Sequence, residues 1–413
     1  AIIDWGDCGG YDFEVIWDKC CTEMLGKSFD AVADRKVNTL SGGEQKKLVL
    51  RALLEGPEEV LLLDEPLSAL EPNAATLNPQ IQLPEIMEPI PEFAMLTAEV
   101  PTVVMAGAGA GDDAVELAEA FGWPLFAEPS SGARSGANAI LGYRNLLDLD
   151  GNWATLASEI GRVIVFGKPT LGRAAIKLLF NPAVEVVVVR SPQMGHFDVS
   201  RRAGQLVDEI TVDNEVDFEW LESWRRADAE HALTQPATGE LDRRSLVEKV
   251  WEATDGEDQL VLGASRLIRE ADVWAPAKAL RVFSNRGLAG IDGTVATAAG
   301  IALVATEGTT RVLLGDLTLL HDAGSLAIDS TEPEPNLQVI VGNDGGGSIF
   351  SSLEMAKTLD EATFTRLFKT PQSVDLWHLA QAYGWDYARV ENLGQLDDAL
   401  TQKGRILVDV RLS

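Results

Sequence analysis

The sequence predicts an α/β protein that contains two doubly wound domains, each built around a parallel sheet. Short runs of β-branched and other apolar residues alternate with helical stretches from about residue 101 onward, and this alternation is typical of parallel strands joined by helices. Two acidic residues, Asp316 and Asp344, each follow one of these runs, and Asp344 comes 28 residues after Asp316. That separation is long enough for a right-handed crossover between parallel strands.

The first of these domains is expected over residues 101–235. Its predicted strands are 102–106, 162–166 and 184–189, and its predicted helices are 112–121 and 173–180. A run of glycine and alanine at 107–111 separates the first strand from the first helix. Such a run fits either a dinucleotide-binding loop or a tight turn. No acidic residue closes a second strand about 20 residues later, and this favours the turn.

The second domain is expected over residues 236–413. Its predicted strands are 260–262, 282–283, 312–314, 337–341 and 405–410. Residues 294–303 are small and apolar, and we expect them to form a helix that can lie close to a ligand. Ligands of open parallel sheets bind at the carboxyl ends of the strands, so the candidate site is expected there.

Asp316 and Asp344 are candidate metal ligands at this edge. Carboxylate oxygens suit a hard cation such as Mg²⁺, which keeps few protein ligands and bridges to the phosphates of a substrate. The glycines that follow, Gly345, Gly346 and Gly347, allow a bound diphosphate to approach the backbone closely. The same residues also fit an ordinary turn at the end of a strand, which would bind no metal.

Three further segments surround these acids: Ser284-Asn285-Arg286-Gly287, Gly290-Ile291-Asp292-Gly293 and Gly346-Gly347-Ser348-Ile349-Phe350. Together with Gly315-Asp316-Leu317 and Asn343-Asp344, they resemble the thiamine diphosphate enzymes, which hold Mg²⁺ and the cofactor's diphosphate with such a motif. The narrower resemblance, over about residues 78–413, is to the 2-succinyl-5-enolpyruvyl-6-hydroxy-3-cyclohexene-1-carboxylate synthase family of menaquinone biosynthesis. It implies that both parallel-sheet domains are of the thiamine diphosphate enzyme type.

The resemblance implies roles for individual residues. Asp316 and the backbone at Gly346 would hold Mg²⁺, and the second side-chain ligand, commonly asparagine in this motif, would be Asn343 or Asp344. The residues implied to contact the cofactor are Gly290, Ile291, Asp292, Gly315, Gly345, Gly346, Ile349, Phe350 and Leu353. The residues implied to act in catalysis by binding substrate carboxylates are Ser265, Arg269 and Arg286. A guanidinium fork suits that task, although Arg269 also fits a solvated helix charge.

The resemblance further implies a transferase that uses thiamine diphosphate and Mg²⁺ to join decarboxylated 2-oxoglutarate to isochorismate. Active sites of this family form between two subunits, so we expect either a homo-oligomer or a partner that supplies the pyrimidine domain. That domain carries the glutamate that activates the cofactor, and nothing in residues 1–77 resembles it. We therefore expect an incomplete enzyme that binds the diphosphate weakly and does not turn over alone.

Residues 1–77 resemble a different class of protein. The segment Ser41-Gly42-Gly43 and the later pair Asp64-Glu65 are similar to the signature and Walker B motifs of ATP-binding cassette ATPases of the ribosome-associated type. In that class, the first acid supports Mg²⁺ and the second polarises the attacking water. No Gly-x-x-x-x-Gly-Lys-Ser/Thr loop occurs in the sequence. We therefore expect a partial cassette segment that cannot hydrolyse ATP by itself.

The segment 78–100 is rich in proline and is expected to be a linker between the cassette-like segment and the first parallel-sheet domain. This arrangement leaves two alternative functions open. The chain is then either a partner of a cassette protein with an inert carboxyl half, or a gene fusion with no function of its own.

The composition sets further limits on function. The 413-residue chain has a net charge of −30, which disfavours partners such as nucleic acid or anionic membranes, because both attract clustered Lys and Arg. No apolar run is long enough to span a membrane. The three cysteines, Cys8, Cys20 and Cys21, all fall in the first stretch, and two of them are adjacent. A reducing, cytoplasmic location is therefore expected.

Overall fold

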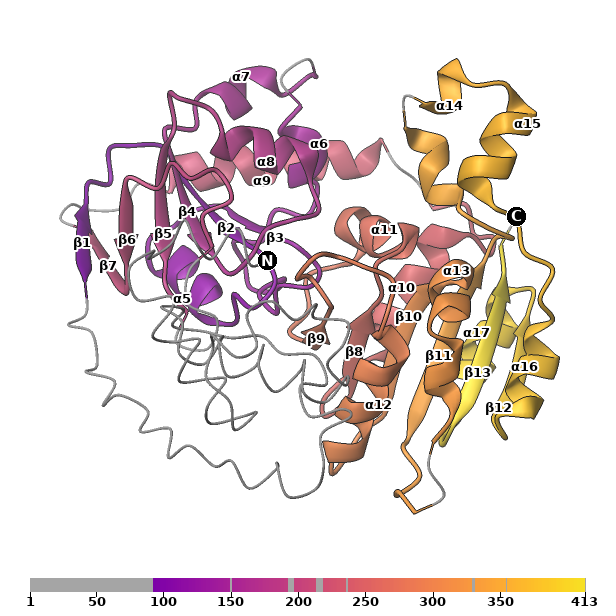
Figure 1. Ribbon diagram of the computed structural model, residues 1–413. Helices are drawn as coiled ribbons and strands as arrows, with labels where there is room; N and C mark the ends of the chain where they lie inside the picture. The colour runs from indigo at the N-terminus through magenta and orange to yellow at the C-terminus, as the bar shows by residue number, and fades with distance from the viewer. Residues whose placement is uncertain are drawn as a thin grey trace, which may run out of the picture. The chain divides into compact units, whose positions relative to one another are not determined.

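The computed structural model describes residues 92–148, 151–191, 197–212, 218–234, 237–328, 331–353 and 355–412 (Figure 1). All of them belong to the structural unit Ile90–Ser413. The cassette-like residues Ser41, Gly42, Gly43, Asp64 and Glu65 lie outside the described residues, so the fold does not test that prediction. Within the described ranges, no helix is long and apolar enough to cross a membrane.

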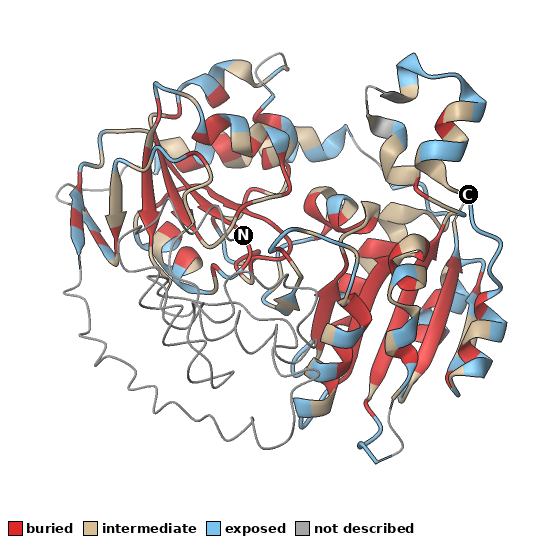
Figure 2. Cartoon of the chain, viewed as in Figure 1, coloured by how far each residue is buried: buried red, intermediate tan, exposed pale blue. Residues whose placement is uncertain are grey.

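The first domain is built on a five-stranded parallel sheet. Its strand order is β3 (Leu125–Ala127), β2 (Thr102–Ala106), β4 (Arg162–Phe166), β5 (Glu185–Val189) and β6 (Gln205–Val207). Alternate side chains of a strand point to opposite faces. Val103 and Met105 accordingly belong to one apolar cluster, and Val104 and Ala106 belong to another. Both faces of the sheet are therefore covered, and Figure 2 shows its central strands as buried.

Helices cover the two faces unequally. Residues of α6 (Tyr143–Leu146), α7 (Ala154–Ser158), α8 (Arg173–Leu179) and α9 (Glu219–Leu233) join the cluster of Val103, and residues of α5 (Asp113–Ala120) join that of Val104. A separate parallel pair, β1 (Phe93–Leu96) with β7 (Glu209–Val212), contributes Ala94 and Ile210 to the second cluster. Strand β1 lies inside the segment 78–100 that was expected to be a linker.

The second domain is built on a six-stranded parallel sheet. Its strand order is β12 (Asp386–Val390), β13 (Ile406–Arg411), β11 (Leu337–Asn343), β10 (Thr310–Gly315), β8 (Gln259–Leu262) and β9 (Arg281–Phe283). One face is covered by α10 (Arg243–Ala253), α11 (Arg266–Trp274) and α17 (Leu393–Leu400). The other is covered by α12 (Thr294–Val304), α13 (Asp316–His321) and α16 (Leu376–Ala382). Figure 1 shows this layer of helices on each side of the strands.

Short helices follow the strand ends of the second domain. They are η3 (Ala323–Leu326), η4 (Ser348–Ser352), α14 (Met355–Thr358), α15 (Glu361–Phe364) and the π-helix η5 (Thr365–Lys369). The ring of Phe368 contacts that of Phe350, with ring centroids 5.9 Å apart. This contact packs η5 against the segment that follows β11.

The prediction of α/β domains with parallel sheets is confirmed, because every pairing between the named strands is parallel. The strands that the sequence did not reveal are short or lie at edges. Edge strand β12, for example, buries only Val390 of its five residues. An edge strand with one exposed face lacks the continuous apolar run that marks a central parallel strand.

A buried polar contact joins the two domains. The Arg134 guanidinium donates to the backbone carbonyls of Ala275 at 2.8 Å and Asp272 at 3.1 Å. The side chain of Asp272 also accepts a hydrogen bond from the hydroxyl of Tyr143. All three of these side chains are buried. Helix α11 of the second domain is thereby held against the first.

Candidate functional site

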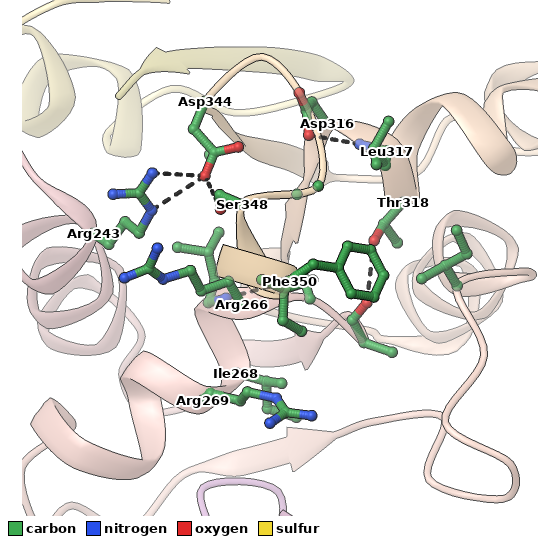
Figure 3. A pocket seen from close by; sticks show the side chains of 18 of the residues that line it. Arg243, Arg266, Ile268, Arg269, Asp316, Leu317, Thr318, Asp344, Ser348 and Phe350 are labelled. Carbon is green, nitrogen blue, oxygen red and sulfur yellow. Dashed lines mark hydrogen bonds and ion pairs between the residues drawn. The ribbon is translucent and has the colours of Figure 1, made fainter. Parts of the chain in front are cut away.

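A cavity of about 270 Å³ opens at the carboxyl edge of the six-stranded sheet. The ends of β10 and β11 and the segment after β11 contribute six of the predicted residues: Gly315, Asp316, Asp344, Gly346, Ile349 and Phe350. The region around α11 and the loop before α12 contribute four more: Ser265, Arg269, Arg286 and Ile291. Ten of the predicted site residues therefore line one cavity, and Figure 3 shows part of its wall.

The register of the sheet explains why the two acids meet. Strands β10 and β11 are parallel neighbours in which Gly315 pairs with Gly342. Asp316 follows directly on β10 and begins α13, and Asp344 comes two residues after Gly342. A shift of one residue in the pairing of the two strands would turn the side chains of one strand to the opposite face of the sheet. The aligned strand ends thus bring Asp316 and Asp344 to the same cavity.

Asp316 is held in an environment that disfavours its negative charge. Its side chain is buried, and its Oδ1 accepts a hydrogen bond of 2.8 Å from the backbone N–H of Leu317. Burial, assisted by the charge of Asp344, raises the pKa of Asp316 to about 6, although backbone N–H groups of Leu317, Gly345 and Gly346 act in the opposite direction. A cation placed between the two carboxylates would favour their ionised forms.

Asp344 already has a cationic partner. Its Oδ2 accepts hydrogen bonds from Nε of Arg243 at 3.1 Å and from Nη2 of Arg243 at 2.8 Å. The hydroxyl of Ser348 donates to the same oxygen. Arg243 precedes Asp344 by 101 residues, and no local pattern in the sequence marks it. Its role becomes visible only when α10 is packed beside β11.

Asn343, the alternative metal ligand, is engaged elsewhere. Its Nδ2 donates to Oδ1 of Asp409 on β13 at 2.9 Å, and its Oδ1 accepts from the backbone N–H of Gly345 at 3.3 Å. The side chain is buried and is not part of the cavity wall. Of the two neighbouring residues, Asp344 is therefore the one that faces the cavity.

The glycine loop after Asp344 packs tightly against η5. Gly346 has a φ of 146°, and a Cβ atom there would lie 2.4 Å from the carbonyl oxygen of Lys369. The backbone N–H of Gly347 donates to that same oxygen at 2.6 Å. Gly345 has a φ of 77° with open space around it. Glycine is thus required at Gly346 by a close approach, and at Gly345 by backbone conformation alone.

The predicted substrate-binding residues also line this cavity. Ser265 is the N-cap of α11, and its Oγ accepts from the backbone N–H of Leu267 at 3.1 Å. The guanidinium of Arg286 is buried and donates through Nε and Nη2 to Oγ1 of Thr170 at 3.0 Å and 2.8 Å. Ser265 and Arg286 are therefore both fixed by hydrogen bonds, and Arg286 is fixed by the first domain.

Arg269 separates the first cavity from a second, of about 900 Å³, and lines both. The second cavity also contains Arg144, Arg173 and Lys177. Burial lowers the pKa of Arg269, and the nearby charges of Arg144 and Arg173 lower it further. Four cations and one acid, Asp148, line this cavity, and this excess of positive charge in a chain with a net charge of −30 favours an anion as its ligand.

Four predicted cofactor residues and one missed residue complete the description. Gly345 and the exposed residues Gly290 and Asp292 lie outside the wall of the first cavity, and Leu353 lines the second cavity instead. Glu128 directly follows β3, so an acidic residue does close a second strand, contrary to the expectation from the sequence; Glu128 is buried, and its Oε1 accepts from the backbone N–H groups of Thr170 and Leu171 at 2.7 Å and 2.6 Å. It thereby fixes Leu171, which lines both cavities.

The donor set of the first cavity fits Mg²⁺ better than a softer metal. Within the described ranges, no group of three or more His, Cys, Asp or Glu side chains converges. Asp316 and Asp344 line the cavity with carboxylate groups, and Gly346 lines it beside them. Mg²⁺ takes one or two carboxylates and completes its shell with water and substrate phosphate, so two acids are enough.

Comparison with known proteins agrees with this site. Residues 269–410 match the family model described as the thiamine pyrophosphate enzyme, C-terminal TPP binding domain. The chain is 43% identical over 348 residues to a 2-succinyl-5-enolpyruvyl-6-hydroxy-3-cyclohexene-1-carboxylate synthase of Leifsonia xyli subsp. xyli, covering 73% of this chain and 58% of the relative. It is 44% identical to the synthase of Clavibacter michiganensis subsp. michiganensis over 66% of this chain and 53% of the relative.

A third synthase, from Paenarthrobacter aurescens, is 42% identical over 76% of this chain and 58% of the relative. The chain is therefore homologous to these synthases and contains a region similar to a thiamine diphosphate-binding domain. It spans somewhat more than half the length of the curated relatives that it matches.

Proposed function

We propose that this chain binds thiamine diphosphate and Mg²⁺ at the carboxyl edge of the six-stranded sheet, and that it serves to join decarboxylated 2-oxoglutarate to isochorismate in menaquinone biosynthesis. The observation that carries the proposal is the meeting of Asp316 and Asp344 in one cavity. The pairing of Gly315 with Gly342 sets that meeting, and both acids fall within the matched residues 269–410.

In this proposal Asp316, Asp344 and a backbone oxygen of the Gly346 loop hold the metal. Gly346 and Gly347, which line the cavity, let the diphosphate approach the backbone closely because they have no side chain. Thiamine diphosphate, when bound, supplies a nucleophilic carbon for a 2-oxo acid and accepts the electrons released by decarboxylation. Ile291 and Phe350, which line the cavity, pack against its rings and keep water away from them.

The remaining residues bind and orient anionic substrates. Arg269 and Arg286 neutralise carboxylates, since both line the cavity; Arg286 is buried and Arg269 is exposed. Thr170 holds the guanidinium of Arg286 at 2.8 Å and 3.0 Å, so its direction is set before substrate arrives. Such pre-organisation lowers the entropic cost of binding. The basic second cavity, which shares Arg269, is a suitable place for the larger of the two anionic substrates.

Two further expectations belong to this proposal. The chain forms a homo-oligomer, or it binds a partner that contributes the pyrimidine domain, because the resemblance implies active sites that form between subunits. The location is cytoplasmic, as the cysteine pattern indicates. The cassette-like motifs of residues 1–77 stay a prediction from the sequence, and a cassette partner is the alternative function.

Titration with thiamine diphosphate tests the proposal. We expect binding by the wild-type chain that is strengthened by Mg²⁺, and we expect Asp316→Ala to weaken binding in Mg²⁺ by about 100-fold, as loss of a metal ligand does. Asp113→Ala removes an exposed acid of α5 and serves as the control. Equal binding by both variants would refute the metal site. Binding of ATP without any response to thiamine diphosphate would favour the cassette alternative.

A second experiment addresses turnover. The chain is mixed with 2-oxoglutarate, isochorismate and the separate pyrimidine domain of an intact synthase, and product formation is followed. Product that depends on both the added domain and Asp316 would support a competent half-site. If the chain binds the cofactor and the mixture still forms no product, the proposed reaction is wrong, but the proposed binding site is not.

A further inference from the structure

Arg243 faces Asp344 at the metal end of the cavity, and Figure 3 shows Arg243 and Asp316 on opposite sides of Asp344. Two guanidinium nitrogens, Nε and Nη2, lie 3.1 Å and 2.8 Å from Oδ2 of Asp344. Ser348 donates to that same oxygen. Among the described residues, no donor is bonded to the other carboxylate oxygen, Oδ1. One oxygen of Asp344 is therefore occupied, and the other is left for a metal.

The place of Arg243 on its helix is unfavourable for a cation. It is the first residue of α10, where the helix dipole is positive, and no acidic residue lies in that first turn. The helix start is already capped, because the side chains of Asp242 and Ser245 bond each other's backbone N–H groups. Arg243 is therefore not needed to cap the helix, and Asp344 supplies the negative charge that balances it.

A bound diphosphate would offer Arg243 a second anionic partner. Arg243 lines the same cavity as Gly346, Gly347 and Ser348 of the proposed diphosphate loop. A guanidinium forms paired hydrogen bonds with phosphate as well as with carboxylate. A divalent ion on Asp316 and Asp344 would repel the positive charge of Arg243. A bound ion would therefore weaken the hold of Asp344 on Arg243, and a bound diphosphate would offer the guanidinium another acceptor.

We propose that Arg243 is a diphosphate-binding residue that stays on Asp344 until metal ion and diphosphate bind, and that it makes their binding cooperative. This inference rests on the proposed function, because it requires both ligands in this cavity. Without diphosphate, Arg243 competes with the metal ion for Asp344. With both ligands present, it contacts the diphosphate. Each ligand then raises the affinity for the other by the same factor.

The test measures two affinities of the full chain: that for Mn²⁺ alone, by electron paramagnetic resonance, and that for thiamine diphosphate in the presence of Mg²⁺. In Arg243→Gln, Mn²⁺ alone is expected to bind about tenfold more tightly because its competitor is gone. Thiamine diphosphate with Mg²⁺ is expected to bind about tenfold more weakly because a charged contact is lost. Arg243→Lys keeps the charge and is expected to lie between Arg243→Gln and the wild type in both affinities.

Arg244→Gln is the matched control. Arg244 is the next residue of the same helix, pairs with Glu248 at 2.8 Å, and lies over the ring of Trp274 at 4.1 Å, away from Asp344. Opposite changes of the two affinities in Arg243→Gln, absent from Arg244→Gln, support the inference. Weaker binding of both ligands would mean that Arg243 only maintains the shape of the loop, and would overturn it. Affinities of Arg243→Gln that match those of Arg244→Gln would also overturn it.

The wild-type chain separates this inference from the proposed function. If it binds neither Mn²⁺ nor thiamine diphosphate, the proposed function is wrong and the role of Arg243 falls with it. If it binds both, and the two affinities of Arg243→Gln do not move in opposite directions, only the role of Arg243 is wrong.

Discussion

The hydroxyl of Tyr143 donates a hydrogen bond to Oδ1 of Asp272 at 2.7 Å, across the junction of the two domains. Both side chains are buried, and Asp272 is 0% exposed. Asp272 belongs to α11, the helix that Ser265 caps and that carries Arg269 into the cavity. The position of two predicted substrate-binding residues therefore depends on a contact with the other domain.

Replacing Tyr143 by phenylalanine should weaken this junction. The ring and its stacking on Phe126, with centroids 5.3 Å apart, are kept, and only the hydrogen bond is lost. We expect the free energy of unfolding to fall by about 1–3 kcal/mol, because Asp272 is left with an unpaired buried oxygen. Urea denaturation measures the change. Tyr383→Phe, at a partly exposed position, is the control, and an equal loss in both variants would show that the bond is unimportant.

Glu128 should make the stability of the fold depend on pH. Burial, followed by the charge of Asp272, raises the pKa of Glu128 from 4.5 to about 8. In the unfolded chain Glu128 loses its proton near its ordinary pKa, whereas in the folded chain it keeps it until about pH 8. The folded state therefore binds more protons between these values, and stability falls as pH rises through this window.

Glu128→Gln removes this titration and keeps an oxygen for the N–H groups of Thr170 and Leu171. We expect the stability of the wild type relative to this variant to fall between pH 5 and 8, by at most about 1.4 kcal/mol per pH unit, and to level off above that range. Chemical denaturation at several pH values measures it. A difference that is constant from pH 5 to 8 would mean that Glu128 is already ionised in the folded state.

The sequence predicts those parts of the fold that are encoded locally. The central strands β2, β4, β10 and β11 are continuous apolar runs because helices cover both their faces, and such runs are visible without a structure. The position of Asp316 and Asp344 at neighbouring strand ends also follows from the order of these runs. The roles assigned to the two acids stay predictions until metal binding is measured.

The contacts that shape the site are not encoded locally. Arg243 reaches Asp344 from a helix 101 residues earlier in the chain, and Asn343 is turned away by Asp409, 66 residues later. Neither pairing produces a periodic pattern or a motif. The burial of Glu128 likewise depends on a distant segment, the loop 168–172 that donates to its carboxylate. Such pairs are found only once the helices have been placed on the sheet.

Gly346→Ala should disrupt the loop more than Gly345→Ala. Both glycines have a positive φ, of 146° and 77°, so alanine is strained at either position. Only at Gly346 would the new Cβ lie 2.4 Å from the carbonyl oxygen of Lys369. We expect about 1 kcal/mol of destabilisation for Gly345→Ala and about 3 kcal/mol for Gly346→Ala. Thermal denaturation measures the loss of stability in each variant. Equal losses would show that η5 moves away from the new Cβ at no cost in stability.

Thr170→Val should impair substrate binding without changing cofactor binding. Valine keeps the shape of threonine but removes the hydroxyl that accepts both N–H groups of Arg286. The guanidinium then loses its fixed direction, and we expect the affinity for 2-oxoglutarate to fall by about tenfold, the equivalent of one charged hydrogen bond. Tryptophan fluorescence titration measures it, with Thr155→Val, at an exposed position of α7, as the control. Because Thr170 lies in the first domain and the metal site in the second, the affinity for thiamine diphosphate with Mg²⁺ should stay at the wild-type value. A parallel loss of both affinities would mean that loop 168–172 supports the whole cavity rather than Arg286 alone.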